Sequence, residues 1–153
     1  MKYELVGLGH SPKVAILCPR IQPDEIIKHY GDLLSVTYPL MVCDLYQDRT
    51  KKKTSNEAIK EYLADLMPNL VNAGINFLIV TQPDYFKVLS KQAKTDATIG
   101  DIYPSIVDGI SVTYMPNYSR VFYDPEKTTA KIKIGINSVI RWMNGDKAPI
   151  GKS

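Results

Sequence analysis

The stretch TSNEAIKEYLADLMPNLVNAGINFLIV, residues 54–80, decides the fold class. Thr54 and Glu57 have the spacing of a capping box, in which a hydroxyl and a carboxylate satisfy each other's free backbone amides. Gly74 then ends the expected helix, and residues 75–80 form a short apolar run typical of a strand covered on both faces. Between these signals, apolar residues recur at helical spacing and form one stripe: Ile59, Leu63, Leu66, Met67, Leu70 and Val71.

The same alternation of strand and helix runs through the rest of the chain. Three further strands are expected, at residues 13–18, 40–46 and 110–114. Helices are expected to begin at Pro23, Pro83 and Asp124, where proline and acidic residues favour a first helical turn. This pattern predicts an α/β fold, a three-layer sandwich in which a small, four-stranded, mostly parallel sheet lies between helices. Residues 1–143 would form one domain, and residues 144–153 would be a flexible tail or a linker within a longer polypeptide.

The composition is that of an ordinary globular protein. Of the 153 residues, 44% are apolar and 23% are charged, and the net charge of +3 permits a polyanionic partner without demonstrating one. Cys18 and Cys43 lie in apolar runs, so we interpret them as buried thiols in a reducing, cytoplasmic compartment. No apolar run approaches the roughly 20 residues needed to cross a bilayer, so no membrane partner is expected.

Function is expected at one edge of the predicted sheet. In parallel sheets ligands bind outside the carboxyl ends of the strands. Four segments follow those ends and should converge there: residues 19–22, 46–53, 81–83 and 115–120.

The densest positive charge lies in the second of these segments. Arg49, Lys51, Lys52 and Lys53 directly precede a predicted helix N-terminus, where a phosphate backbone would find both cations and free amides. The alternative is a solvated, flexible loop that binds nothing.

Aromatic and polar residues gather in the last segment. Asn117, Tyr118 and Arg120 follow the fourth strand, and such side chains can stack on bases and bind phosphates. The alternative is a turn at Asn117 whose aromatic neighbours pack on the last helix.

Signals of enzymatic chemistry are few. His10 and His29 have no Cys or His partner at zinc spacing, so neither a metal site nor a cofactor is expected. Gly7-Leu8-Gly9 precedes the first of the predicted parallel strands instead of following it, unlike a dinucleotide-binding loop. We interpret Asp24 and Glu25 as helix-capping residues.

Three segments resemble the uracil-DNA glycosylase superfamily: VAILCPRIQPDE (residues 14–25), the stretch at residues 54–80, and VTYMPNYSRVFYDPEK (residues 112–127). The resemblance covers about residues 12–143 and implies a small parallel sheet with DNA held across the carboxyl ends of its strands. In the last segment Met115-Pro116-Asn117 stands where the family has His-Pro-Ser. In the first, Cys18-Pro19-Arg20-Ile21-Gln22 stands in place of the motif that carries the catalytic acid.

The resemblance therefore implies a catalytically inactive domain with degenerate positions at Pro19, Gln22 and Met115. Loss of one electrostatic stabiliser typically lowers a rate by about 10²–10³. The third segment is most similar to the glycosylase-like N-terminal domains of phage family A DNA polymerases. This likeness implies a domain that binds DNA or a replication protein in support of phage DNA replication, in the cytoplasm of an infected bacterium. The implied DNA surface comprises Arg20, Arg49, Lys51, Lys52, Lys53, Asn117, Tyr118 and Arg120.

Two alternatives stay open. One is an active enzyme, either a divergent uracil-DNA glycosylase or a nucleotide-directed hydrolase that uses Asp24, Glu25 or Asp44. The other is a pure protein-interaction module that has kept the fold and lost its contact with DNA.

Overall fold

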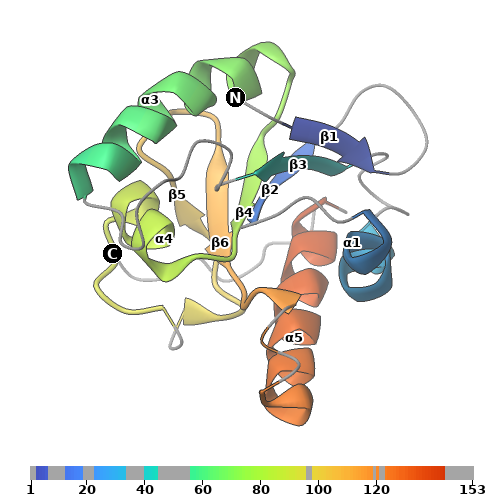
Figure 1. Cartoon of the computed structure of the whole chain (residues 1–153). Coiled ribbons are helices and arrows are strands. Elements are labelled where there is room, and N and C mark those ends of the chain that lie inside the picture. The colour runs from blue at the N-terminus through green and yellow to red at the C-terminus, as the bar shows by residue number, and fades with distance from the viewer. Residues whose placement is uncertain are drawn as a thin grey trace.

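The computed structural model describes residues 3–6, 13–18, 23–33, 40–44, 56–95, 98–118, 120 and 123–143. These residues form one twisted sheet with helices packed on both of its faces (Figure 1). The tail predicted at residues 144–153 and the basic loop at residues 49–53 lie outside the described residues. The predicted cytoplasmic location is not a property that the structure describes.

The sheet has six strands in the order β1-β3-β2-β4-β6-β5. The four inner strands pair in parallel, and this confirms the expected small parallel sheet. The two outer strands, β1 and β5, pair antiparallel with their neighbours and were not expected from the sequence. The strands are β1 (Tyr3–Val6), β2 (Val14–Cys18), β3 (Leu40–Asp44), β4 (Phe77–Val80), β5 (Tyr103–Pro104) and β6 (Ser111–Tyr114).

Four α-helices lie within the described residues, and local signals explain their ends. Asp124 accepts a hydrogen bond from the backbone N–H of Lys127 at 3.4 Å and so caps the last helix. Lys91 ends another helix in the left-handed conformation, with φ 61°. The helices are α1 (Pro23–Tyr30), α3 (Asn56–Asn72), α4 (Pro83–Ser90) and α5 (Pro125–Met143), and the short 3-10 helix η1 (Gly31–Leu33) follows α1.

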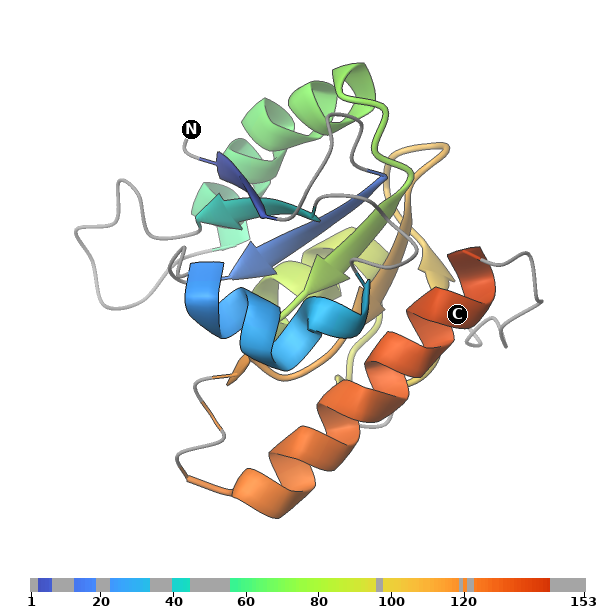
Figure 2. The same ribbon diagram turned by 90° about the vertical axis from the view of Figure 1, so that its right-hand side faces the viewer.

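The helices bury both faces of the sheet. Figure 2 shows α1 and α5 in front of the sheet and α3 behind it. Successive residues of a strand point to opposite faces, so the all-apolar runs of β2 and β4 supply both cores at once. Ala15, Leu17, Leu78 and Val80 face α3 and α4, whereas Val14, Ile16, Phe77 and Ile79 face α1 and α5.

Candidate functional site

The strand order contains a switch point between β2 and β4, on either side of which the chain connects to the next strand in opposite directions. The chain passes from β2 to β3 on one side of this point and from β4 to β6 on the other. Ligands of open parallel sheets bind outside the carboxyl ends of the strands at such a switch point. We therefore take the carboxyl ends of β2, β4 and β6 as the candidate functional site and call them the carboxyl edge.

A buried hydrogen-bonded chain fixes the centre of the carboxyl edge. Thr81, directly after β4, donates its hydroxyl to the carbonyl of Leu17 at 2.7 Å. The Asn117 side-chain amide donates to the same hydroxyl oxygen at 3.3 Å. Thr81 and Asn117 are 2% and 4% exposed, so each would be costly to leave without a partner. This chain links the ends of three strands and sets the position of the loop that follows β6.

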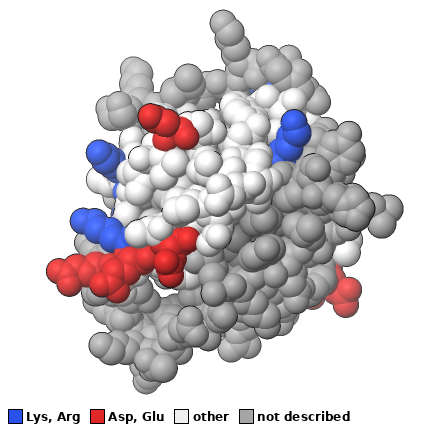
Figure 3. Space-filling model, turned by 90° about the horizontal axis from the view of Figure 1, so that it is seen from above, with Lys and Arg blue, Asp and Glu red and all other residues white. Residues whose placement is uncertain are grey.

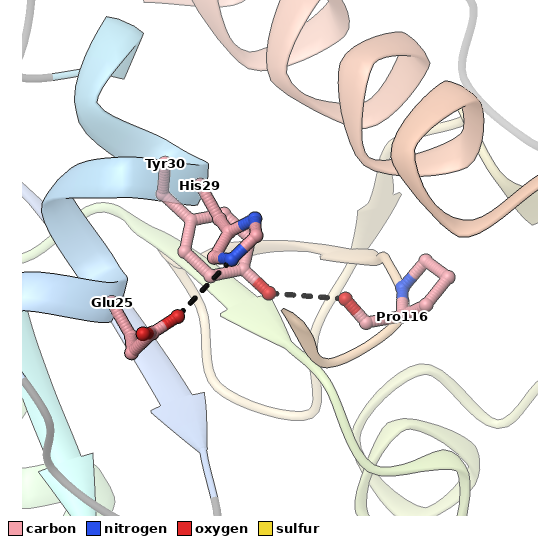
Figure 4. Close-up of polar contacts among 4 residues, drawn as sticks. All are labelled: Glu25, His29, Tyr30 and Pro116. Carbon is pink, nitrogen blue, oxygen red and sulfur yellow. Dashed lines mark hydrogen bonds and ion pairs between the residues drawn. The ribbon is translucent and has the colours of Figure 1, made fainter. Parts of the chain in front are cut away.

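Tyr30 fastens α1 to the same loop. Its hydroxyl donates to the carbonyl of Pro116 at 3.0 Å, across 86 residues of sequence (Figure 4). Burial raises the pKa of Tyr30 well above its usual value, and the nearby Cys18 raises it further. The hydroxyl therefore stays protonated and keeps its role as a donor.

Tyr118 is held between two side chains of α1. Its ring stacks on His29 at a centroid distance of 5.4 Å and meets Tyr30 edge-on at 6.3 Å. His29 also pairs with Glu25, its Nε2 lying 3.2 Å from a carboxylate oxygen (Figure 4). A partly buried carboxylate–imidazole pair thus borders the carboxyl edge.

Met115 occupies the position at which the resemblance places a lost catalytic histidine. Its side chain is fully buried among residues of the α1/α5 core. It packs so closely on Gly135 of α5 that a β-carbon there would lie 2.8 Å from its terminal methyl carbon. Pro19 and Gln22, the other two degenerate positions, lie outside the described residues. Met115 therefore serves as a packing residue.

The structure describes only part of the predicted DNA surface. Asn117 and Tyr118 are 4% and 6% exposed, and their contacts are internal, so they position the loop. Arg120 is exposed beside them. The other five predicted residues lie outside the described part of the chain: Arg20, Arg49, Lys51, Lys52 and Lys53. Asp44 ends β3, but its side chain is not described.

Tyr30 and the pairing of Glu25 with His29 were not predicted as parts of the site, whereas Thr81 lies in the segment at residues 81–83 that was expected there. Glu25 was interpreted as a helix-capping residue and kept as a candidate only for the alternative hydrolase, and His29 was considered only as a metal ligand. Tyr30 follows Ile26 by four residues and so belongs to the apolar stripe of α1, which could have placed it against the sheet. The position of Thr81 after a buried strand was expected, but its hydrogen bonds to Leu17 and Asn117 have no signal in the sequence.

Exposed charge differs between the helices of the two faces. α5 carries four cations, Lys127, Lys131, Lys133 and Arg141, and one carboxylate, Glu126. α3 carries three carboxylates and one cation. Since α5 begins just after Arg120, its cations start near the carboxyl edge and continue along this helix, which Figure 2 shows in front of the sheet.

No protein-family model matches this sequence, and no curated protein matches it either. Within the described residues, no group of three or more His, Cys, Asp or Glu side chains is placed to hold a metal ion. None of the helices in that part of the chain is both long and apolar enough to cross a membrane.

Proposed function

We propose that this chain is a non-catalytic, uracil-DNA glycosylase-like domain that binds DNA in support of a replicative phage polymerase. The observation that carries the DNA-binding part is the run of exposed cations that begins at the carboxyl edge. Arg120, Lys127, Lys133 and Arg141 are all exposed and lie on or just before α5. A helix of this length extends for about 28 Å, enough to follow several phosphates of a nucleic-acid backbone.

The non-catalytic part is supported by Met115. A thioether is neither a proton donor nor a cation, and this one is packed against α5 instead of facing solvent. Association with a polymerase rests on the sequence resemblance, as do the contacts proposed for Arg20, Arg49 and Lys51–Lys53.

Fluorescence anisotropy with labelled single-stranded and duplex oligonucleotides tests DNA binding. Binding at about 50 mM salt should weaken steeply by about 200 mM, because each phosphate contact adds about 0.7–0.9 to the logarithmic salt slope. The double variant Lys127→Glu/Lys133→Glu should lower affinity by at least about tenfold and flatten the slope by about 1–2.

The matched control is Lys87→Glu/Lys94→Glu, which changes the net charge equally at exposed positions away from α5. It should alter affinity less than about threefold if local contacts dominate. Absence of binding at about 50 mM salt, or equal weakening by both variants, would reject the α5 surface.

A second candidate, a nucleotide-directed hydrolase, is favoured by the Glu25–His29 pair at the carboxyl edge. Such a pair can move a proton in acid–base chemistry. The test is incubation with uracil-containing single-stranded DNA followed by alkali. Strand breaks that disappear in Glu25→Gln would establish catalysis, and intact strands with the unaltered protein would leave the non-catalytic proposal standing.

A further inference from the structure

An apolar groove lies on the opposite face of the sheet from α5. Its walls are α3 and the turn between β5 and β6, and it encloses about 470 Å³. Val71 and Ile106, one on each wall, are 50% and 47% exposed. Contiguous exposed apolar surface of this kind marks interaction sites in soluble proteins. The apolar lining comprises chiefly Leu63, Ala64, Met67, Val71, Ile106 and Val107.

Pro68 adds a polar feature to this groove. Because proline has no N–H, the carbonyl of Ala64 lacks the usual helical donor four residues on. Both Ala64 and Pro68 line the groove. The otherwise apolar wall therefore includes a backbone acceptor that lacks its usual helical donor.

A row of carboxylates follows the groove along α3. Glu57, Glu61 and Asp65 are exposed and spaced by four residues, so they stack along one side of the helix. Asp108, also exposed, adjoins Val107 on the other wall. Figure 3, seen from above, shows a broad uncharged surface with acidic and some basic side chains at its border. The groove is thus apolar inside and mainly acidic along its margins, although Lys60 also lines it.

We propose that this groove binds a basic amphipathic helix of a partner protein. An amphipathic helix buries apolar residues at positions i, i+3, i+4 and i+7 in such a groove. Lysine or arginine residues beside that stripe would face the carboxylate row, and this complementarity would set orientation and partner choice. The lining part of α3, from Lys60 to Asn72, rises about 18 Å, which matches about three turns of a bound helix.

This inference goes beyond the proposed DNA binding and does not depend on it. The groove and α5 cover opposite faces of the sheet, and their charges have opposite sign. Failure of one proposal therefore leaves the other untouched.

The probe is a synthetic, fluorescein-labelled helix of about 18 residues, with leucine at the stripe positions and lysine on both flanks. Two matched peptides serve as references: one carries glutamate in place of lysine, and the other has the same composition in scrambled order. The lysine helix should bind at least about tenfold more tightly than either reference. Equal binding of the lysine helix and the scrambled peptide would overturn the proposal.

Protein variants locate the site. Val71→Ser and Ile106→Ser should each weaken binding by about fivefold or more, because each removes an apolar contact from one wall. Glu57→Gln/Glu61→Gln/Asp65→Asn should weaken it and also flatten its salt dependence. The matched control is Ile134→Ser on α5, which changes a side chain that is 52% exposed on the other face.

These substitutions lie at exposed positions, so the fold should persist, and circular dichroism verifies it for each variant. Equal weakening by Ile134→Ser and Val71→Ser would overturn the proposed location. A second copy of this chain is the competing occupant, since α5 is itself basic and exposes Ile134. Self-association in sedimentation experiments that Val71→Ser abolishes would replace the partner helix with that second copy.

Discussion

The two faces of the sheet differ in the charge of the helices that cover them, although the same strands supply both cores. The core between the sheet and α3/α4 consists of aliphatic and aromatic side chains, and α3 presents mainly carboxylates to solvent. The core beneath α1 and α5 likewise combines aliphatic side chains with aromatic ones and a methionine, and it also holds the Cys18 thiol, but α5 presents mainly cations to solvent.

Directed hydrogen bonds connect distant segments on the α1/α5 face. Tyr30 bonds to the Pro116 carbonyl, Thr113 to that of Asp101, and Ser138 to that of Gly100. Apolar contacts tolerate small shifts, whereas hydrogen bonds fix distance and direction. We infer that the α3/α4 face chiefly stabilises the fold, and that the α1/α5 face also positions the carboxyl edge.

The largest effect is expected from Phe86→Ala in the α3/α4 core. Phe86 is fully buried and lies within 6.0 Å, ring centroid to centroid, of both Tyr103 and Tyr114. The cavity should lower the free energy of unfolding by about 3–5 kcal/mol, measured by urea denaturation. Phe86→Leu, which fills part of the space, is the control and should cost less. A loss below about 1 kcal/mol for Phe86→Ala would show that packing is not what stabilises this face.

Tyr30→Phe should have a smaller effect, because it removes one hydroxyl and leaves the shape of the α1/α5 core intact. The Pro116 carbonyl loses its partner, at a cost of about 1–3 kcal/mol. The variant should also loosen the loop after β6, seen as faster amide hydrogen exchange at residues 115–118. Unchanged hydrogen exchange at residues 115–118 would contradict the inference that the α1/α5 face positions the carboxyl edge.

The same variant gives a pH signature. Burial raises the folded-state pKa of Tyr30, so the unfolded chain loses this proton first, at about pH 10. The stabilisation is complete below that pH and is lost as the pH rises toward the folded-state pKa. The stability difference between the unaltered protein and Tyr30→Phe should therefore shrink between about pH 8 and about pH 10.5. A difference that grows over this range would contradict the buried, protonated hydroxyl.

Gly135→Ala should have a smaller net effect, since two terms oppose each other. The new β-carbon would lie 2.8 Å from the Cε and 3.2 Å from the Cβ of Met115. Overpacking costs about 1–3 kcal/mol, and higher helix propensity returns about 1 kcal/mol. In a Met115→Ala background the cost should fall because the Cε contact is gone. An identical cost in both backgrounds would show that Met115 and α5 are not coupled.

Much of the fold followed from the sequence because its signals are local. The apolar runs of β2 and β4 predicted strands buried on both faces, and the alternation of strands with helices predicted parallel pairing. Of the outer strands, β5 has only two residues, too few for a pattern, and β1 contains Glu4 and so forms no continuous apolar run like that of β4. Their pairing depends on neighbours elsewhere in the chain.

The site followed from the sequence only in outline. Topology placed the loop at residues 115–120 on the carboxyl edge, but residue type did not reveal that Asn117 and Tyr118 face inward. That orientation depends on Thr81 and on α1, which are far away in sequence. Arg120, exposed in the same loop, is consistent with either of the two interpretations of the segment.

The smallest effect is expected from Glu25→Gln, at the solvent margin of the α1/α5 face. The two side chains of the Glu25–His29 pair are 40% and 16% exposed, so solvent screens their attraction. Glutamine keeps an acceptor oxygen for His29 and removes only the charge. The free energy of unfolding should fall by less than about 0.5 kcal/mol, and by less still in about 1 M salt. If the loss instead exceeded about 1 kcal/mol, the pair would itself help to stabilise the fold, and the division between the two faces would fail at this margin.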